Sequence, residues 1–156
     1  ELLVRGPQVF SGYYGKPEET EAVFVDGWFR TGDIVTIDEG GFVRIVDRIK
    51  ELIITGGFNV APTEVETALR QHPAVEDAAV VGLPSEHSGE EVVAVVVPTP
   101  GRDLDVEEVI EFSRGILTPY KVPRRIFVVD ELPRSLIGKV LRKQVREQLR
   151  ELISGQ

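Results

Sequence analysis

The first 46 residues alternate short apolar runs with glycine-rich turns, a pattern typical of antiparallel β-structure. A short helix is predicted at residues 17–24, because proline and acidic side chains favour a helix start. So small a β segment cannot bury a core alone, and we expect it to pack on protein outside this chain. Strands are predicted at residues 2–4, 9–10, 28–30, 34–37 and 42–46, the last two forming a hairpin.

From residue 51 onward, helical periodicities alternate with continuous apolar runs. The runs at 78–83 and 92–97 are apolar throughout, as in strands that are covered on both faces. We therefore expect an α+β domain with helices packed on a mixed sheet around three apolar strands, joined to the β-rich part at residues 47–50. Helices are predicted at residues 62–71, 106–117 and 140–153, and strands at 52–54, 78–83, 92–97 and 126–129.

Each predicted helix after residue 51 has an apolar stripe. Pro62 opens the first helix and the His72-Pro73 pair closes it. Asp105 is a good N-cap for the second helix, and Glu108 would complete a capping box. The residues expected to face the core are Val65, Ala68 and Leu69 in the first helix, Val106, Val109, Ile110 and Ser113 in the second, and Leu141, Val145, Leu149 and Leu152 in the third.

Composition narrows the class of protein. Of the 156 residues, 42% are hydrophobic and 28% are charged, as in globular domains, and no apolar run reaches the roughly 18–20 residues that a membrane span needs. The net charge of −8 argues against general binding to nucleic acid or anionic membranes. Cysteine is absent, which excludes disulfides, thiol catalysis and thiolate metal sites. Methionine is also absent and the chain begins with Glu1, so we expect a piece of a longer protein.

The Thr31-Gly32-Asp33 turn is a candidate ligand site. An ionised aspartate offers two acceptor oxygens, which suit neighbouring hydroxyl donors such as those of a ribose. A turn aspartate more often bonds its own backbone, however, and the tripeptide alone favours that structural role. Arg48 could reach a nucleotide phosphate or sugar, although a surface ion pair with Asp47 or Glu51 is the simpler interpretation.

Two glycine-containing loops are further candidates. Gly56-Gly57 would let the backbone approach a ligand or adopt positive φ, but could equally end a strand in a turn. Lys139 follows Gly138 in PRSLIGK, where a long flexible side chain can deliver positive charge to a buried anion. A P-loop is rejected, since Pro133 stands in place of its first glycine and Val140 in place of its Ser/Thr.

Other polar residues are better explained by structure than by chemistry. Arg142, Arg146 and Arg150 recur at i+4 spacing and could bind phosphate, but a solvated helix face with a Lys143–Glu147 pair is the simpler interpretation. The two histidines, His72 and His87, lie at a helix end and in a polar loop, without metal-ligand partners at useful spacing. No metal site is therefore expected within this chain.

The order of the motifs along the chain is a more specific signal of a protein family than any single motif is. The chain contains, in sequence, ELLVRGPQVFSGYYGKPEET, GWFRTGD, VDRIKELIITGGFNVAPTEVE, YKVP and LPRSLIGKVLRK. In order and spacing these segments resemble the C-terminal third of the adenylate-forming superfamily, which comprises acyl- and aryl-CoA synthetases, peptide-synthetase adenylation domains and beetle luciferases. GGFN resembles the fatty-acyl-CoA synthetases, or long- and medium-chain fatty acid–CoA ligases, more than the peptide-synthetase pattern.

The resemblance implies a reaction and a division of the chain. In this superfamily ATP and a carboxylate form an acyl-adenylate and pyrophosphate, and a thiol then takes the acyl group. Residues 1–49 would be the β-rich end of a large N-terminal adenylation domain, and residues 50–156 a mobile C-terminal lid domain. The implied cofactors are ATP, coenzyme A and Mg²⁺. The Mg²⁺ site, the phosphate loop and the acyl pocket would lie before Glu1, so this chain alone is expected to be inactive.

Matching positions imply a role for each candidate residue. Asp33 would bind the ribose hydroxyls, and Arg48 would lie near the ribose and phosphate. Lys50 falls at the hinge, while Gly56, Gly57 and Phe58 would line the tunnel for the thiol. Lys139 would be the catalytic lysine, contacting the substrate carboxylate and the α-phosphate of ATP.

Two other interpretations stay open. The acyl group could pass to the phosphopantetheine arm of a carrier protein, and, against the motif order, the basic last helix could belong to a non-enzymatic binding module. The expected partners are a carboxylic acid, ATP, CoA and the rest of the same protein, with no nucleic acid and no transmembrane segment. A cytoplasmic location is expected. The acyl chain length is not encoded here, because its pocket would lie outside the chain.

Overall fold

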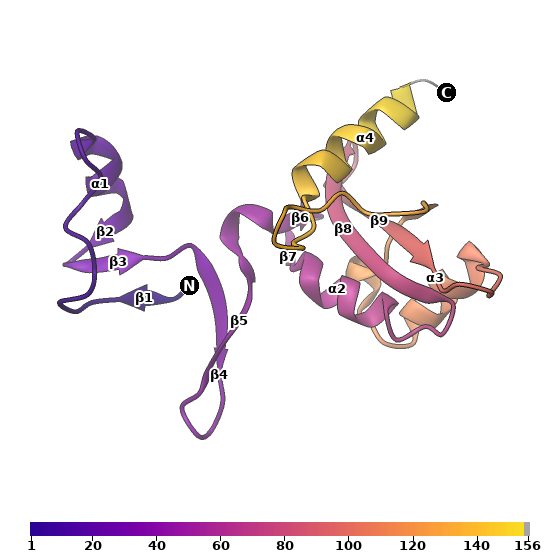
Figure 1. Cartoon of the computed structure of the whole chain (residues 1–156), viewed down its shortest axis with the longest axis horizontal. Helices are drawn as coiled ribbons and strands as arrows, with labels where there is room; N and C mark the ends of the chain where they lie inside the picture. The colour runs from indigo at the N-terminus through magenta and orange to yellow at the C-terminus, as the bar shows by residue number, and fades with distance from the viewer. Residues whose placement is uncertain (155–156) are drawn as a thin grey trace. The chain divides into compact units, whose positions relative to one another are not determined.

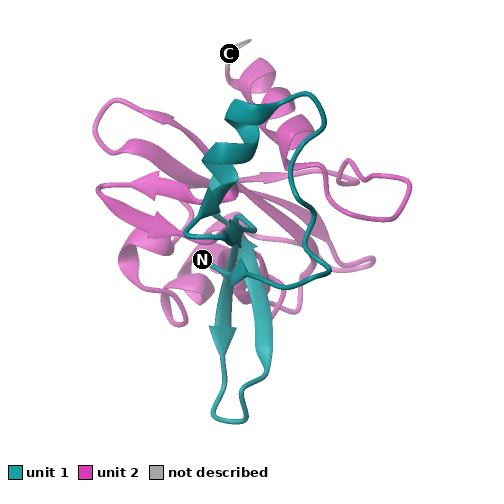
Figure 2. Ribbon diagram, turned by 90° about the vertical axis from the view of Figure 1, so that its left-hand side faces the viewer, with its two compact units in different colours: residues 1–50 teal, residues 51–156 magenta. Residues whose placement is uncertain are grey.

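The change of sequence pattern near residue 50 is also a boundary in the structure. The computed structural model, which describes residues 1–154, divides into unit 1 (Glu1–Lys50) and unit 2 (Glu51–Gln156) (Figure 2). The predicted boundary fell between residues 49 and 50. The assignment of the two parts to a large domain and a lid stays a prediction.

Unit 1 consists of short elements. Strands β1 (Leu3–Val4), β3 (Trp28–Arg30) and β2 (Phe24–Val25) pair in that order as an antiparallel sheet, and helix α1 (Pro17–Val23) precedes β2 (Figure 1). Strands β4 (Asp33–Ile37) and β5 (Val43–Arg48) form a separate antiparallel hairpin, followed by the 3₁₀ turn η1 (Ile49–Glu51). The strand predicted at residues 9–10 is wrong, since the Val9 N–H bonds the Gly6 carbonyl in a turn.

Unit 1 buries almost no side chain. Among residues 1–50, all of which the structure describes, only Asp47 is buried. The hairpin β4–β5 leaves Ile37, Phe42 and Ile45 between 62% and 76% exposed. The prediction that this segment cannot bury a core alone is therefore confirmed.

In unit 2 the sheet is mixed, as predicted. Strands β8 (Val75–Ser85) and β9 (Gly89–Pro98) form a long antiparallel hairpin, and β10 (Arg125–Val128) runs parallel to β9. The small hairpin of β6 (Ile53–Thr55) and β7 (Phe58–Val60) joins β9 where Thr55 pairs with Gly89. Around this sheet lie α2 (Pro62–Leu69), α3 (Val106–Arg114), the turn η2 (Pro119–Lys121) and α4 (Arg142–Ser154).

The sheet separates two cores, because successive side chains of a strand point to opposite faces. The face toward α2 and α3 carries Ala78, Val80, Val92, Ala94 and Val96, which pack with Val65, Leu69 and Val109. The opposite face carries Ala79, Val81, Leu83, Val93 and Val95, which pack with Val145 and Leu149 of α4. Apolar runs at 78–83 and 92–97 thus reflect burial on both faces, which confirms the α+β prediction.

The three helices predicted after residue 51 are shorter at one end than predicted. Helix α2 ends at Leu69 rather than 71, and α3 at Arg114 rather than 117. In both places the next residues form i→i−3 bonds, such as His72 N–H to the Leu69 carbonyl at 3.0 Å, which tighten and close the last turn. Helix α4 begins at Arg142 rather than 140, since the Leu141 N–H instead bonds the Pro133 carbonyl at 2.8 Å.

Two further helix predictions need correction. Leu152 is 53% exposed, and Ile153 packs in the core in its place, which continues the spacing of four from Val145 and Leu149. The Asp105 side chain caps α3 by accepting from the Glu107 N–H rather than from the Glu108 N–H of a capping box. The other predicted inward-facing residues of α2 and α3 do pack in the core.

Candidate functional site

Asp33 and Arg48 face each other at the open end of the β4–β5 hairpin. They are paired in register, and the Arg48 Nε lies 3.0 Å from the Asp33 Oδ1. The Asp33 side chain is only 16% exposed, whereas that of Arg48 is 57% exposed. The ion pair predicted between Arg48 and Asp47 or Glu51 is therefore replaced by one with Asp33.

The Thr31 hydroxyl supports the Asp33 backbone. It accepts from the Asp33 N–H at 3.0 Å and donates to the Leu2 carbonyl at 2.9 Å. Gly32 has a φ of +71°, and its carbonyl accepts from the Ile49 N–H at 2.9 Å. The turn is thus closed by Thr31, and the Asp33 carboxylate, paired through one oxygen, retains acceptor capacity for hydroxyl donors.

A pocket of about 500 Å³ brings several of these residues together within unit 1. Its walls include Thr31, Gly32, Arg48 and Lys50. Lys50, the predicted hinge, lies exposed in η1 at the last position of the unit. The wall also includes Glu1, and a side-chain hydrogen bond from Arg30 lowers the pKa of its carboxyl group.

Gly56 and Gly57 form the two-residue turn between β6 and β7. Their φ angles are +56° and +83°, and Thr55 pairs with Phe58 across the turn. Positive φ at both positions is what a tight hairpin of this kind requires. A Cβ added at either glycine would meet nothing within 4 Å, so backbone conformation rather than space within this unit selects glycine here.

An aromatic pair lies beside this turn. The ring of Phe58, 54% exposed, stacks on that of Tyr120 in η2 at a centroid distance of 4.5 Å. The neighbouring Lys121 Nζ lies 2.6 Å and 2.8 Å from the two carboxylate oxygens of Glu64 in α2. Tyr120 and Lys121 were not singled out individually, although the YKVP segment that contains them was part of the resemblance.

Lys139 is exposed in a turn before α4, not in the helix. The Ser135 N–H donates to its carbonyl at 2.8 Å, and its own N–H donates to the Ser135 hydroxyl at 3.2 Å. Gly138 has a φ of +79°, and an isolated bridge joins Arg134 to Val140. The lysine therefore stands at the end of a small hydrogen-bonded loop, with its side chain accessible to a ligand.

The arginines of the basic stripe on α4 do not share one exposed surface. Arg142 is mostly buried and donates to both carboxylate oxygens of Glu66 at 3.0 Å and 2.8 Å. Glu66 also accepts from the Val80 N–H at 2.9 Å, so it links α2, α4 and the edge of β8. Arg150 is exposed, and Lys143 lies 3.9 Å from Glu147, as the simpler interpretation predicted.

The two histidines have different surroundings. His72 is buried, its Nδ1 accepts from the Ala74 N–H at 3.3 Å, and its ring packs edge-on against Phe112. His87 is exposed in the turn between β8 and β9. Within residues 1–154 no cluster of three or more His, Asp or Glu side chains has the geometry to hold a metal ion. In the same range, no helix is long and apolar enough to cross a bilayer.

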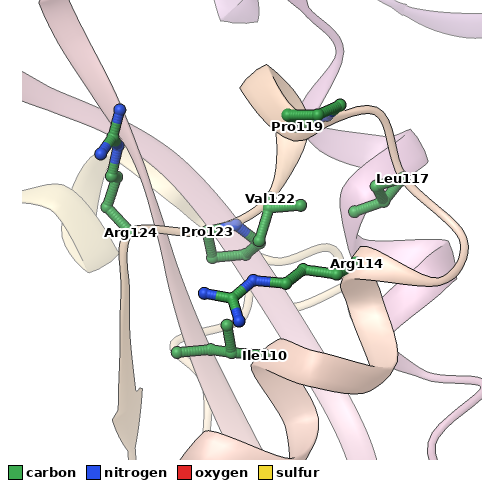
Figure 3. Close-up of a pocket in the computed structure, with 7 residues that line it drawn as sticks. All are labelled: Ile110, Arg114, Leu117, Pro119, Val122, Pro123 and Arg124. Atoms are coloured by element: carbon green, nitrogen blue, oxygen red, sulfur yellow. The ribbon is translucent and has the colours of Figure 1, made fainter.

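A second pocket, of about 600 Å³, lies between α3 and the segment after η2 (Figure 3). Its walls combine apolar Ile110, Leu117 and Val122 with the guanidinium groups of Arg114 and Arg124. The side chain of Arg114 extends from α3 toward Ile110 and Pro123. Val122 and Pro123 in its wall belong to the YKVP segment, although no sequence pattern predicted the pocket itself.

One protein-family model matches part of unit 2. Residues 64–139 match the family described as the AMP-binding enzyme C-terminal domain. The chain is 48% identical over 148 residues to a long-chain-fatty-acid–CoA ligase of Bacillus subtilis (strain 168), an alignment that covers 95% of the chain and 26% of the ligase. It is 45% identical to a feruloyl-CoA synthase of Amycolatopsis sp, again over 95% of the chain and 30% of the relative.

The chain is also similar to a solved structure. The crystal structure of ATP-bound MatB from Rhodopseudomonas palustris matches with a TM-score of 0.89 and 43% identity, over 96% of this chain and 30% of that protein. The chain therefore spans between a quarter and a third of the length of the relatives it matches.

Proposed function

We propose that the chain, whose residues 64–139 match the AMP-binding enzyme C-terminal domain family, is the C-terminal part of an AMP-forming fatty acid–CoA ligase. The observation that carries the proposal is the 48% identity to a long-chain-fatty-acid–CoA ligase over nearly the whole chain. The full-length protein would join a carboxylic acid to ATP as an acyl-adenylate and then pass the acyl group to CoA. This chain alone would be inactive.

Unit 1 would contribute to nucleotide binding. The Asp33 carboxylate, held in place by the turn at Thr31 and by Arg48, has the two oxygens that a ribose diol requires. The half-exposed guanidinium of Arg48 would reach the ribose or a phosphate oxygen. Lys50, at the end of the unit, would be the hinge at which the lid turns.

Unit 2 would serve the two half-reactions with different faces. Lys139 would place positive charge where attack of the carboxylate builds negative charge at the α-phosphate. The Gly56-Gly57 turn and Phe58 would line the path of the thiol, and a side chain at Gly57 would narrow that path. One lid cannot present both sites at once, so it would alternate between them.

The acid would be selected by protein outside this chain. Relatives named for a long-chain fatty acid and for ferulate are nearly equally similar to it, at 48% and 45% identity. CoA is the proposed acceptor because both of these relatives are named for CoA. Transfer to a carrier-protein phosphopantetheine is the alternative, and formation of free acyl-CoA by the full-length protein distinguishes the two.

The remaining cofactor and the compartment are also part of the proposal. ATP and CoA would be the substrates that the candidate residues meet. Mg²⁺ would be held by residues of the full-length protein that lie outside this chain. We propose a cytoplasmic enzyme.

The first test removes the Lys139 ammonium group. In the full-length protein, Lys139→Ala should lower the rate of acyl-adenylate formation by about two to three orders of magnitude, the effect of losing one electrostatic stabiliser of a transition state. Conversion of supplied acyl-adenylate to acyl-CoA should stay near the wild-type rate. Pyrophosphate release and acyl-CoA formation from the purified adenylate measure the two steps separately.

Lys50→Pro is the matched counterpart, because proline fixes φ at the hinge. This variant should form acyl-adenylate but stall at thioester formation. Equal impairment of both steps by Lys139→Ala, or normal thioester formation by Lys50→Pro, would contradict the alternating lid.

A further inference from the structure

We propose that Arg134 is a positioning residue for Lys139: held by Asp77 of β8, it fixes the turn from which the lysine extends. The inference rests on the proposed role of Lys139 in adenylation. It concerns how a lysine on an exposed loop is kept in one place before it meets its substrate.

Arg134 makes two contacts, one with the sheet and one with the residue before Lys139. Its Nη2 forms an ion pair with the Asp77 Oδ2, and its Nη1 donates to the Gly138 carbonyl at 2.5 Å. Gly138 directly precedes Lys139, so a single guanidinium connects β8 to the residue next to the lysine. The planar fork of an arginine can donate in two fixed directions at once, which a lysine ammonium cannot reproduce with the same geometry.

Asp77 is itself held in position. Its Oδ1 lies 3.6 Å from the Arg70 Nη1 and accepts from the Ala78 N–H at 2.8 Å. Its side chain is 21% exposed, compared with 45% for that of Arg134. The anchor therefore lies on β8 and is the less exposed partner, while the arginine is the more accessible one.

The apolar side chains at the tip of the turn do not hold it in position. Leu136 and Ile137, between Arg134 and Lys139, are 108% and 77% exposed. Beyond the lysine, the chain is anchored by the Leu141 N–H to the Pro133 carbonyl and by Arg142 to Glu66. Val140 packs against the core on the α4 side of the sheet, and Ser135 bonds Gly138 and Lys139 within the turn. Arg134 adds the contact that connects Gly138, beside Lys139, to β8.

The decisive experiment compares Arg134→Ala with Asp77→Asn and with the double variant in the full-length protein. Arg134→Ala should lower acyl-adenylate formation about tenfold to a hundredfold, the scale of a misplaced catalytic group, and leave thioester formation from supplied adenylate unchanged. Asp77→Asn should lower the rate of acyl-adenylate formation less than Arg134→Ala does, because the contact between Arg134 and the Gly138 carbonyl persists. The double variant should be no worse than Arg134→Ala, and Arg134→Lys should recover part of the rate.

Lys143→Ala is the matched control. Lys143 forms an exposed i,i+4 pair with Glu147 at 3.9 Å on α4, so its loss removes one cation and one ion pair from the same unit. Both half-reactions should keep their wild-type rates in this variant. Arg134 is exposed enough that its replacement should not prevent folding, and thermal unfolding of each variant checks this.

Hydrogen exchange provides a readout that does not depend on activity. Peptides covering residues 134–141 should exchange faster in Arg134→Ala than in wild type, because the Gly138 and Lys139 N–H groups bond within the turn. Peptides covering β8 and β9 should not change. A merely structural arginine would instead loosen the sheet together with the turn.

The outcomes separate this inference from the function on which it rests. If Lys139→Ala adenylates normally, the proposed role of Lys139 fails, whatever the exchange data show for the turn. If Lys139→Ala is inactive but Arg134→Ala adenylates at the wild-type rate, the positioning role is overturned. Faster exchange of the turn without a slower adenylation step would also overturn it.

Discussion

At the residue scale, Asp33 combines a structural contact with a free capacity to bind. Its carboxylate pairs with the Arg48 Nε at 3.0 Å, while its backbone is bonded by Thr31. Replacing Asp33 therefore both removes an acceptor and releases the arginine. A loss of ATP affinity in such a variant has two possible causes, which a change in the ligand can separate.

Asp33→Ala in the full-length protein should weaken ATP binding by roughly 2–4 kcal/mol, as expected for loss of charge-assisted bonds to two hydroxyls. Calorimetry with ATP and with 2′-deoxy-ATP locates the cause. The wild type should discriminate against the deoxynucleotide, and Asp33→Ala should bind both alike. Equal discrimination by the two proteins would show that Asp33 only holds Arg48.

At the element scale, the β6–β7 turn poses a similar question about Gly57. Its φ of +83° is strained for any other residue, and the turn orders Phe58 against Tyr120. A substitution could thus impair thioester formation either by straining the hairpin or by obstructing the thiol. The choice of substituent distinguishes these effects, since asparagine tolerates left-handed backbone better than alanine does.

Both Gly57→Ala and Gly57→Asn should slow the thiol step and spare adenylation. If the path of the thiol is obstructed, the larger asparagine should slow it at least as much as alanine. If strain is responsible, alanine should be the worse variant and should unfold at the lower temperature. Thioester formation from supplied acyl-adenylate and thermal unfolding, measured side by side, decide between the two.

Element types were predictable from the sequence where periodicity is long, and less so at edges. The two apolar runs and the stripes of α2 and α3 identified the sheet and its helices, because each pattern repeats several times. Phe24 of the short strand β2 was instead predicted at the end of a helix, and no element was predicted at β7. Strands of two or three residues depend on pairing with partners, which no local pattern specifies.

The contacts that surround the candidate residues were not predictable from the sequence. The ion pair of Asp33 with Arg48 needs the β4–β5 register, and those of Arg134 with Asp77 and Arg142 with Glu66 join positions far apart in sequence. Glu66 illustrates the difficulty, since a glutamate on α2 would ordinarily be expected in solvent. Its burial follows from three donors, Val80 N–H among them, which tertiary packing alone brings together.

At the scale of the whole molecule, the two units should differ in stability. Unit 2 has apolar cores on both faces of its sheet, whereas unit 1 buries only Asp47 among its fully described residues. Amide exchange in this chain should therefore be much slower in β8 and β9 than in β4 and β5. Better protection of the strands before Asp47 than of residues 78–83 would contradict this expectation.

The same measurement in the full-length protein provides the control. If the rest of the protein covers the exposed Ile37, Phe42 and Ile45, protection of β4 and β5 should rise there. Protection of β8 and β9 should change little, because their partners all lie within unit 2.

The two-faced sheet has a consequence for how β8 and β9 find their alignment. When one face of a hairpin is polar, a slip by one residue exposes apolar side chains and is strongly disfavoured. Here a slipped hairpin would still bury apolar residues on both sides, so burial discriminates weakly between alignments. The correct alignment is instead favoured by polar groups whose partners have fixed positions. These pairs are Glu66 with the Val80 N–H, Asp77 with Arg134, and Glu91 with Arg125. Misalignment of this sheet would therefore be penalised chiefly by unpaired charges rather than by exposed hydrocarbon.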